Sequence, residues 1–208
     1  MKSIFTGKSR LYLITDRKIS GLSPTSIVKQ AISAGIGIVQ LREKDLPKKE
    51  IFREAAAIRT LTRKSRVKFI INDHVDIALA TGADGVHLGQ EDLPIYDARM
   101  ILGRKKIIGI STRTLKQAID AESSGADYIG FGPVFSTSTK MTVRPKGLKA
   151  IRDIRRHIKI PVVAIGGIKS DDVPDILEAG ADAFAVASGI LSGDIRINIM
   201  RYLSVQDT

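Results

Sequence analysis

Short runs of β-branched and apolar residues alternate with amphipathic segments along almost the whole sequence. Each short run is typical of a buried strand, and each intervening segment carries apolar residues at helical spacing. The predicted strands are Leu11–Thr15, Ile36–Leu41, Lys68–Asn72, Gly85–Leu88, Lys106–Ser111, Tyr128–Phe131, Pro161–Ile165 and Ala183–Ala187. Eight strands that alternate with helices in 208 residues predict an α/β fold, a single-domain (β/α)8 TIM barrel over residues 1–208. An open doubly wound sheet is the structural alternative.

Local signals place two of the predicted helices. The first runs from about residue 24 to 34, with Ser23 as its cap and Pro24 in its first turn. The second begins near Pro47. Its apolar stripe at helical spacing is Ile51, Ala55, Ile58 and Thr62.

A glycine precedes four of the predicted strands, and the signal returns about once every two βα units. These glycines are Gly35, Gly82, Gly125 and Gly180, and Ala-Asp follows the last three. Glycine can end a helix in the left-handed conformation and turn the chain into the next strand. The chain therefore looks like four similar quarters, each made of two βα units. We interpret the aspartates of the repeated tripeptide, together with Asp16 and Asp45, as structural.

The composition excludes several classes of function. A chain without cysteine has no disulfide, no thiol nucleophile and no Cys-ligated metal. No apolar run is long enough to span a bilayer, and the first ten residues lack the apolar core of a signal peptide, so we expect a cytoplasmic protein with no membrane partner. The net charge of +11 suits phosphorylated ligands or nucleic acid. Aromatic residues make up only 5% and are not interleaved with the basic clusters, so we expect no nucleic-acid partner.

The residues that carry chemistry follow the predicted strands, and the active site of a (β/α)8 barrel lies at those strand ends. Gln40, Arg42 and Lys44 end the second strand and fall on one side of it, because alternate residues of a strand share a face. This strand therefore delivers positive charge to the mouth of the barrel. An ion-paired strand end that involves Glu43 is the alternative.

Two carboxylates follow the next two strands. Asp73 comes after Asn72, a neutral donor, and Asp92 follows the fourth strand. Two nearby carboxylates repel each other unless a cation or a proton lies between them, and with a phosphorylated substrate the pair suggests Mg²⁺. The alternative is that each carboxylate caps a helix, Asp92 capping one from about Pro94.

Glycines at the ends of the last two strands indicate a phosphate site. Gly166-Gly167 lets backbone N–H groups approach an anion closely. Ser188-Gly189 opens a short predicted helix whose N-terminus favours negative charge. The alternative for Gly166-Gly167 is a simple tight turn. Lys140, in the polar loop after the sixth strand, adds another cation, and His87 is interpreted as a barrel residue with satisfied hydrogen bonds.

Five motifs, in this order, closely resemble thiamine phosphate synthase and span nearly the whole chain. They are Gln40-Leu41-Arg42-Glu43-Lys44, Ile71-Asn72-Asp73, Gly85-Val86-His87-Leu88-Gly89-Gln90-Glu91-Asp92, Gly130-Phe131-Gly132-Pro133-Val134-Phe135 with Thr137 and Thr139-Lys140, and Ala164-Ile165-Gly166-Gly167-Ile168. Each motif alone is weak evidence, whereas the ordered set is highly specific.

The resemblance implies a transferase that joins hydroxymethylpyrimidine diphosphate to a thiazole phosphate and releases diphosphate. It implies dissociative chemistry, in which a pyrimidine carbocation forms and the thiazole nitrogen captures it. By the matching positions, Asp73 and Asp92 would bind Mg²⁺. Arg42, Lys44, Asn72 and Lys140 would hold the diphosphate with Gln40 and Ser111 nearby, Thr137 and Thr139 would approach the thiazole phosphate, and Gly167, Ala187 and Ser188 would cradle its phosphate. Arg42, Lys44, Lys140 and Ser111 are the predicted catalytic residues.

Two positions depart from the family pattern. Arg113 stands where many relatives have the histidine of a Ser-x-His-Thr pattern, and Ser136 replaces the more usual Pro or Phe. A related thiazole tautomerase relies on a histidine near the Arg113 position, so the resemblance favours the synthase. An isomerase of a phosphorylated small molecule and a non-catalytic phosphate binder are the alternative functions. The role of Arg113, the preferred thiazole form and the oligomeric state stay open, and a homo-oligomer is compatible with the sequence.

Overall fold

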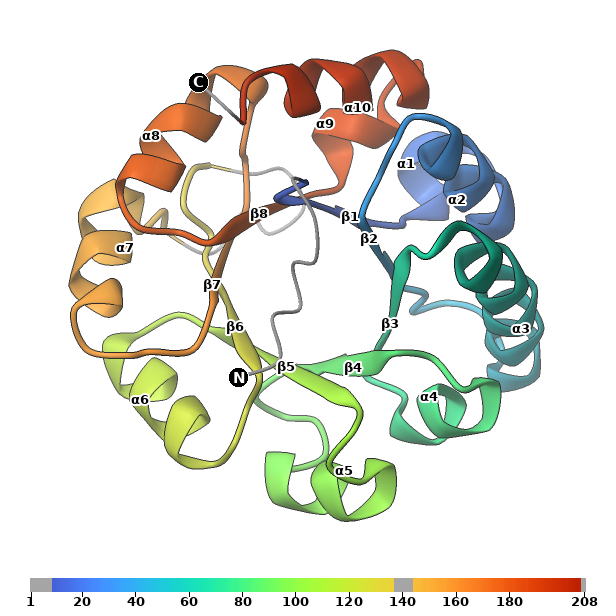
Figure 1. Ribbon diagram of the computed structural model, residues 1–208, viewed down its shortest axis with the longest axis horizontal. Helices are drawn as coiled ribbons and strands as arrows, with labels where there is room; N and C mark the ends of the chain where they lie inside the picture. The colour runs from blue at the N-terminus through green and yellow to red at the C-terminus, as the bar shows by residue number, and fades with distance from the viewer. Residues whose placement is uncertain (1–8, 137–143, 207–208) are drawn as a thin grey trace.

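The strands close into a parallel barrel. The computed structural model describes residues 9–136 and 144–206, and Figure 1 shows the strands as a central ring surrounded by helices. The strands are β1 (Leu11–Ile14), β2 (Ile38–Leu41), β3 (Lys68–Asn72), β4 (Gly85–Leu88), β5 (Ile107–Thr112), β6 (Tyr128–Phe131), β7 (Val162–Ile165) and β8 (Ala183–Val186). Each strand pairs with the next, and β1 pairs with β8, so the predicted (β/α)8 barrel is confirmed and the open sheet is wrong.

Helices follow the strands and cover the outer face of the barrel (Figure 1). They are α1 (Arg17–Ser20), α2 (Pro24–Ser33), α3 (Lys48–Ser65), α4 (Val75–Thr81), α5 (Ile95–Leu102), α6 (Leu115–Ser123), α7 (Gly147–Arg155), α8 (Val173–Glu178) with the short 3₁₀ turn η2 (Ser170–Asp172) before it, α9 (Ser188–Leu191) and α10 (Ile195–Ser204). No described helix has the length and apolar character needed to cross a bilayer.

The alternation of side chains along each strand divides the core into two parts. Leu11 and Leu13 face outward into the large core between strands and helices. Tyr12 and Ile14, one residue along, face inward and fill the barrel with apolar residues from the other strands. The inner core contains two buried tyrosines, Tyr12 and Tyr128, whose polar ends require hydrogen-bond partners there.

The predicted helix signals are confirmed. The Ser23 side chain accepts a hydrogen bond from the Ser26 N–H at the start of α2. The predicted apolar stripe of α3, which is Ile51, Ala55, Ile58 and Thr62, is buried. The four repeated glycines all have positive φ, between 67° at Gly82 and 101° at Gly180. Each turn therefore uses the conformation that glycine adopts at little cost.

The repeated aspartates act at the end of the barrel opposite the predicted site. Asp84 accepts hydrogen bonds from the Phe69 N–H of β3 and from Arg59 of α3, both at 2.9 Å. The same arrangement joins Asp127 to Ile108 and Arg99, and Asp182 to Val162 and Arg155. Each aspartate thus ties the start of one strand to a neighbouring helix. Their interpretation as structural residues is confirmed.

Candidate active site

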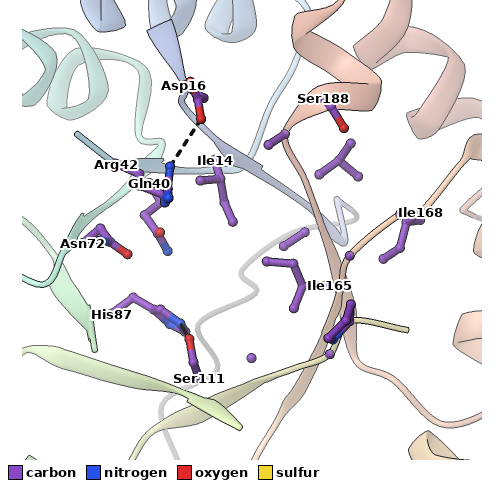
Figure 2. Close-up of a pocket in the computed structure, with 18 of the residues that line it drawn as sticks. Ile14, Asp16, Gln40, Arg42, Asn72, His87, Ser111, Ile165, Ile168 and Ser188 are labelled. Carbon is purple, nitrogen blue, oxygen red and sulfur yellow. Dashed lines mark hydrogen bonds and ion pairs between the residues drawn. The ribbon is translucent and has the colours of Figure 1, made fainter. Parts of the chain in front are cut away.

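One cavity opens at the carboxyl ends of the strands. Its wall includes seven residues predicted from the sequence to bind substrate: Gln40, Arg42, Asn72, Ser111, Gly167, Ala187 and Ser188. Figure 2 shows Gln40, Arg42, Asn72 and His87 along one side, with Ile165, Ile168 and Ser188 across the cavity. The barrel closure brings these residues together from strands that lie far apart in the sequence.

An ion pair holds Arg42, the residue directly after β2, at the cavity wall. The Arg42 Nη1 atom lies 3.2 Å from Asp16 Oδ2, and the Arg42 N–H donates to Thr15 Oγ1. Asp16 also caps α1 by accepting from the Lys18 N–H, so the carboxylate has two partners. The expected alternative, an ion pair with Glu43, is wrong. The structure places Asp16 in the cavity wall, a position that its interpretation as a structural residue did not anticipate.

Glu43 is buried, with 6% of its surface exposed. Its Oε1 atom has no hydrogen-bond partner. Burial raises the pKa of Glu43, an effect that the nearby Arg17 charge partly offsets. Glu43 therefore forms no ion pair with Arg42 or Lys44, whose carboxylate partners are Asp16 and Asp73.

Asp73 and Asp92 form the carboxylate pair that the sequence predicted. Burial, together with the neighbouring Asp92 carboxylate, raises the pKa of Asp73, and Lys44 opposes this with its Nζ 3.8 Å from Asp73 Oδ2. Asp73 has a φ of 62°, an unfavourable backbone conformation for a residue other than glycine. Lys44 thus offsets the repulsion between the two carboxylates only in part.

Neither carboxylate caps a helix. The N-cap residues of α4 and α5 are His74 and Pro94, and neither end has a side-chain cap hydrogen bond. Asp92 Oδ2 instead accepts from the Gly89 N–H at 2.5 Å and so stays in the loop after β4. The capping alternative is therefore wrong for both residues.

The glycines after β7 lie where a side chain could not be accommodated. Gly166 and Gly167 have φ values of 99° and 68°, and a Cβ on Gly167 would lie 2.2 Å from the Ser136 carbonyl oxygen. Ser188 begins α9, as predicted. The sequence predicted a phosphate site at Gly166, Gly167, Ser188 and Gly189, and we call these residues the phosphate cradle after that prediction.

Tyr202 of the last helix supports the phosphate cradle from behind. Its hydroxyl donates to the Ile168 carbonyl at 2.8 Å, and a Cβ on Gly189 would lie 2.3 Å from the same hydroxyl oxygen. Burial raises the pKa of Tyr202 to about 12, so it stays a donor at neutral pH. Sequence reasoning missed this residue, because nothing local to α10 shows which loop its hydroxyl reaches.

The resemblance implies that thiazole phosphate binds at the phosphate cradle. Tyr202→Phe should then raise its KM about fivefold, the size expected for the loss of one buried hydrogen bond. The KM for the pyrimidine diphosphate should stay within about a factor of two, because the resemblance implies that this substrate binds in a different part of the cavity. Steady-state kinetics with each substrate varied in turn would measure both values. Tyr96→Phe is the matched control, because Tyr96 is 70% exposed. An equal rise in both KM values would contradict the assignment.

His87 and Arg113 also line the cavity. The His87 ring contacts the Tyr128 hydroxyl through Nδ1 and Ser111 Oγ through Nε2, each at 2.9 Å. The interpretation of His87 as a barrel residue with satisfied hydrogen bonds is therefore confirmed. The backbone N–H of Arg113 donates to Gln117 Oε1. This contact assigns no role to the Arg113 guanidinium.

Three predicted residues, Thr137, Thr139 and Lys140, lie outside the described residues. Within residues 9–136 and 144–206, no group of three or more His, Asp or Glu gathers in a way that could hold a metal by itself. A divalent ion beside Asp73 and Asp92 would therefore need ligands from elsewhere, such as substrate phosphate oxygens and water.

Comparisons with known proteins agree with the motifs. The model of a family described as thiamine monophosphate synthase matches residues 11–190. This chain belongs to that family. It is 47% identical over 187 residues to the thiamine-phosphate synthase of Clostridium novyi, covering 89% of this chain and 92% of that protein. It is 45% identical over 187 residues to the thiamine-phosphate synthase of Chloroflexus aurantiacus, covering 89% and 86%.

A solved structure extends the agreement to three dimensions. The thiamine phosphate pyrophosphorylase from Pyrococcus furiosus superposes with a TM-score of 0.89 at 39% identity, covering 96% of both chains. Membership of the synthase family confirms the predicted function, thiamine phosphate synthesis, and the predicted enzyme class, a transferase.

Proposed function

We propose that this synthase family member condenses hydroxymethylpyrimidine diphosphate with a thiazole phosphate and releases diphosphate by a dissociative route. The observation that carries the proposal is that Arg42 and Asn72 line one side of the cavity while Ser188 lies across it (Figure 2). One half of the cavity is formed by Arg42 and Asn72. Lys44 and Asp73 follow them in the chain and contact each other, and Asp92 lies beside Asp73. The phosphate cradle forms the other half. A reaction between a diphosphate and a monophosphate requires two such halves.

The first half suits a departing diphosphate. Arg42 can bind phosphate oxygens through two N–H groups, and Lys44 adds a point charge. Because breakage of the pyrimidine methylene–oxygen bond leaves charge on the diphosphate, cations fixed beforehand at that place stabilise the transition state more than the substrate. The Asp16–Arg42 ion pair fixes the guanidinium direction before the substrate arrives. Lys140 would add a third cation by its position in the family motif.

Asp73 and Asp92 fit Mg²⁺ by their chemistry. They are hard oxygen ligands, and burial together with the neighbouring Asp92 carboxylate raises the pKa of Asp73 although Lys44 lies 3.8 Å from it. We assign both as ligands that would hold the ion against the substrate diphosphate. When bound, Mg²⁺ would supply positive charge that neutralises the leaving group.

The second half suits the thiazole phosphate. The phosphate cradle offers backbone N–H groups at Gly167 and Ser188, and Tyr202 braces it. Ala187 lies in the same wall, and Thr137 and Thr139 would approach the thiazole from the loop after β6. Binding the phosphate here would hold the thiazole nitrogen toward the pyrimidine half, so that capture of the carbocation is faster than attack by water.

Chelation of Mg²⁺ should abolish formation of thiamine phosphate, and added Mg²⁺ should restore it. The physical reason is that the two carboxylates, which Lys44 neutralises only in part, repel the diphosphate when no metal lies between them. Product is measured by chromatography after treatment with a chelator, and the buffer-exchanged enzyme with Mg²⁺ returned is the control. Full activity in excess chelator would contradict the metal assignment.

A further inference from the structure

A chain of hydrogen bonds crosses the inside of the barrel beneath the cavity. The Gln40 Nε2 atom donates to the Tyr12 hydroxyl at 2.8 Å, and this hydroxyl lies 3.0 Å from that of Tyr128. The Tyr128 hydroxyl lies 2.9 Å from His87 Nδ1, and His87 Nε2 lies 2.9 Å from Ser111 Oγ. The chain thus joins two predicted substrate-binding residues, Gln40 and Ser111, through three residues that no assigned role explains.

We propose that Tyr12, Tyr128 and His87 form a polarity relay, in which the Gln40 amide sets the His87 tautomer and leaves the Ser111 hydroxyl proton free to donate into the cavity. This inference rests on the proposed function only for the identity of the substrates. The three relay residues are positioning residues, because they act through Gln40 and Ser111.

The direction of each hydrogen bond follows from counting protons. A phenol has one proton, so Tyr12, which accepts from Gln40, donates to Tyr128. Tyr128 then donates to His87 Nδ1, and a neutral imidazole that accepts at Nδ1 carries its proton at Nε2. The Nε2–H group donates to Ser111 Oγ, so the Ser111 hydroxyl proton takes no part in this series of hydrogen bonds.

Inside the barrel, each of these buried donors must find its acceptor within the protein. Tyr12, Tyr128 and Gln40 have at most 2% of their surfaces exposed, so water is not available to satisfy a misdirected proton. Burial also raises the pKa of both tyrosines well above its usual value, so both remain protonated donors. A doubly protonated His87 would leave one phenol proton without an acceptor, which would cost the desolvation free energy of that group.

The strands leave space for the relay. A Cβ on Gly109 would lie 2.1 Å from the Tyr128 ring, and a Cβ on Gly130 would lie 3.0 Å from the His87 ring. Glycine weakens a strand interior, so its presence at both places indicates that the rings need the room. The rings also pack together, with centroids 5.4 Å apart for His87 and Tyr128.

The relay leaves a different group available at each end. At one end Gln40 Oε1 is an acceptor, and at the other end the Ser111 hydroxyl is a donor. An aminopyrimidine has the complementary groups, an amino donor and ring-nitrogen acceptors. If the relay ran the other way, Ser111 would donate to His87 and the cavity would lose this donor.

The test is ¹⁵N NMR of the full chain with labelled histidine. The chain contains only three histidines, so few signals need to be assigned. We expect His87 to be neutral near neutral pH, with its proton on Nε2 and Nδ1 an acceptor. The Nδ1–H tautomer in the unchanged protein would overturn the proposal. In Tyr128→Phe the tautomer should shift toward a mixture, since Nδ1 loses its donor. A folded Tyr128→Phe protein with an unchanged tautomer would also overturn it.

Kinetics provides the second readout. Tyr128→Phe should lower kcat/KM for the pyrimidine diphosphate about tenfold and leave the KM for thiazole phosphate unchanged. Tyr96→Phe is the matched control, and Tyr12→Phe breaks the chain one residue earlier should Tyr128→Phe fail to fold. If the unchanged protein forms no thiamine phosphate, the proposed function fails, while the NMR result still decides the relay.

Discussion

Asp92→Asn should lower turnover by about 100-fold while the dissociation constant for thiazole phosphate changes by less than about a factor of two. The substitution keeps the shape of the side chain and an oxygen that can accept from the Gly89 N–H, but it removes the negative charge that would hold Mg²⁺. Steady-state kinetics gives the turnover, and calorimetry of the thiazole phosphate gives the binding constant.

The matched control is Asp97→Asn, an exposed aspartate in the first turn of α5, a short distance along the same segment. It changes the net charge by the same amount and should leave both values unaffected. Equal losses of turnover and of thiazole phosphate affinity in Asp92→Asn would show that Asp92 supports the shape of the site and does not hold a metal.

Arg42→Ala should reduce kcat/KM for the pyrimidine diphosphate about 50-fold, the loss expected for charge-assisted hydrogen bonds to a phosphate. It should leave the KM for thiazole phosphate within about a factor of two, because the phosphate cradle lies across the cavity (Figure 2). Arg42→Lys should fall between these values, since it keeps the charge and loses the two-pronged contact.

Arg53→Ala, on the exposed face of α3, controls for the loss of one positive charge from the molecule. A thermal unfolding curve of each variant separates loss of the site from loss of the fold. A thiazole phosphate KM that rises as much as the pyrimidine diphosphate KM would contradict the division of the cavity into two halves.

The fold was accessible from the sequence because its signals are local. A buried strand shows as a short β-branched run, and a helix shows as an apolar stripe with a capping residue such as Ser23. Each predicted strand lies within two residues of the observed one. The eightfold alternation then left few topologies, because connections between parallel strands are short and of one hand.

The site was accessible only in part. Strand ends such as Arg42 and Asp73 could be placed at the mouth because a barrel collects all strand ends on one side. Three other features could not be predicted, because each joins residues that are far apart in sequence. They are the Asp16–Arg42 ion pair, the hydrogen bond from Tyr202 to Ile168, and the contact between Tyr12 and Tyr128 beneath the cavity. Which inward side chains meet depends on strand stagger and on helix packing, and neither has a local signal.

The most direct test of this account is to mix the purified protein with hydroxymethylpyrimidine diphosphate, thiazole phosphate and Mg²⁺, and to measure thiamine phosphate and diphosphate together. Both products should appear in equal amounts, and omission of Mg²⁺ should stop their formation. A folded protein that forms no thiamine phosphate under these conditions would contradict it.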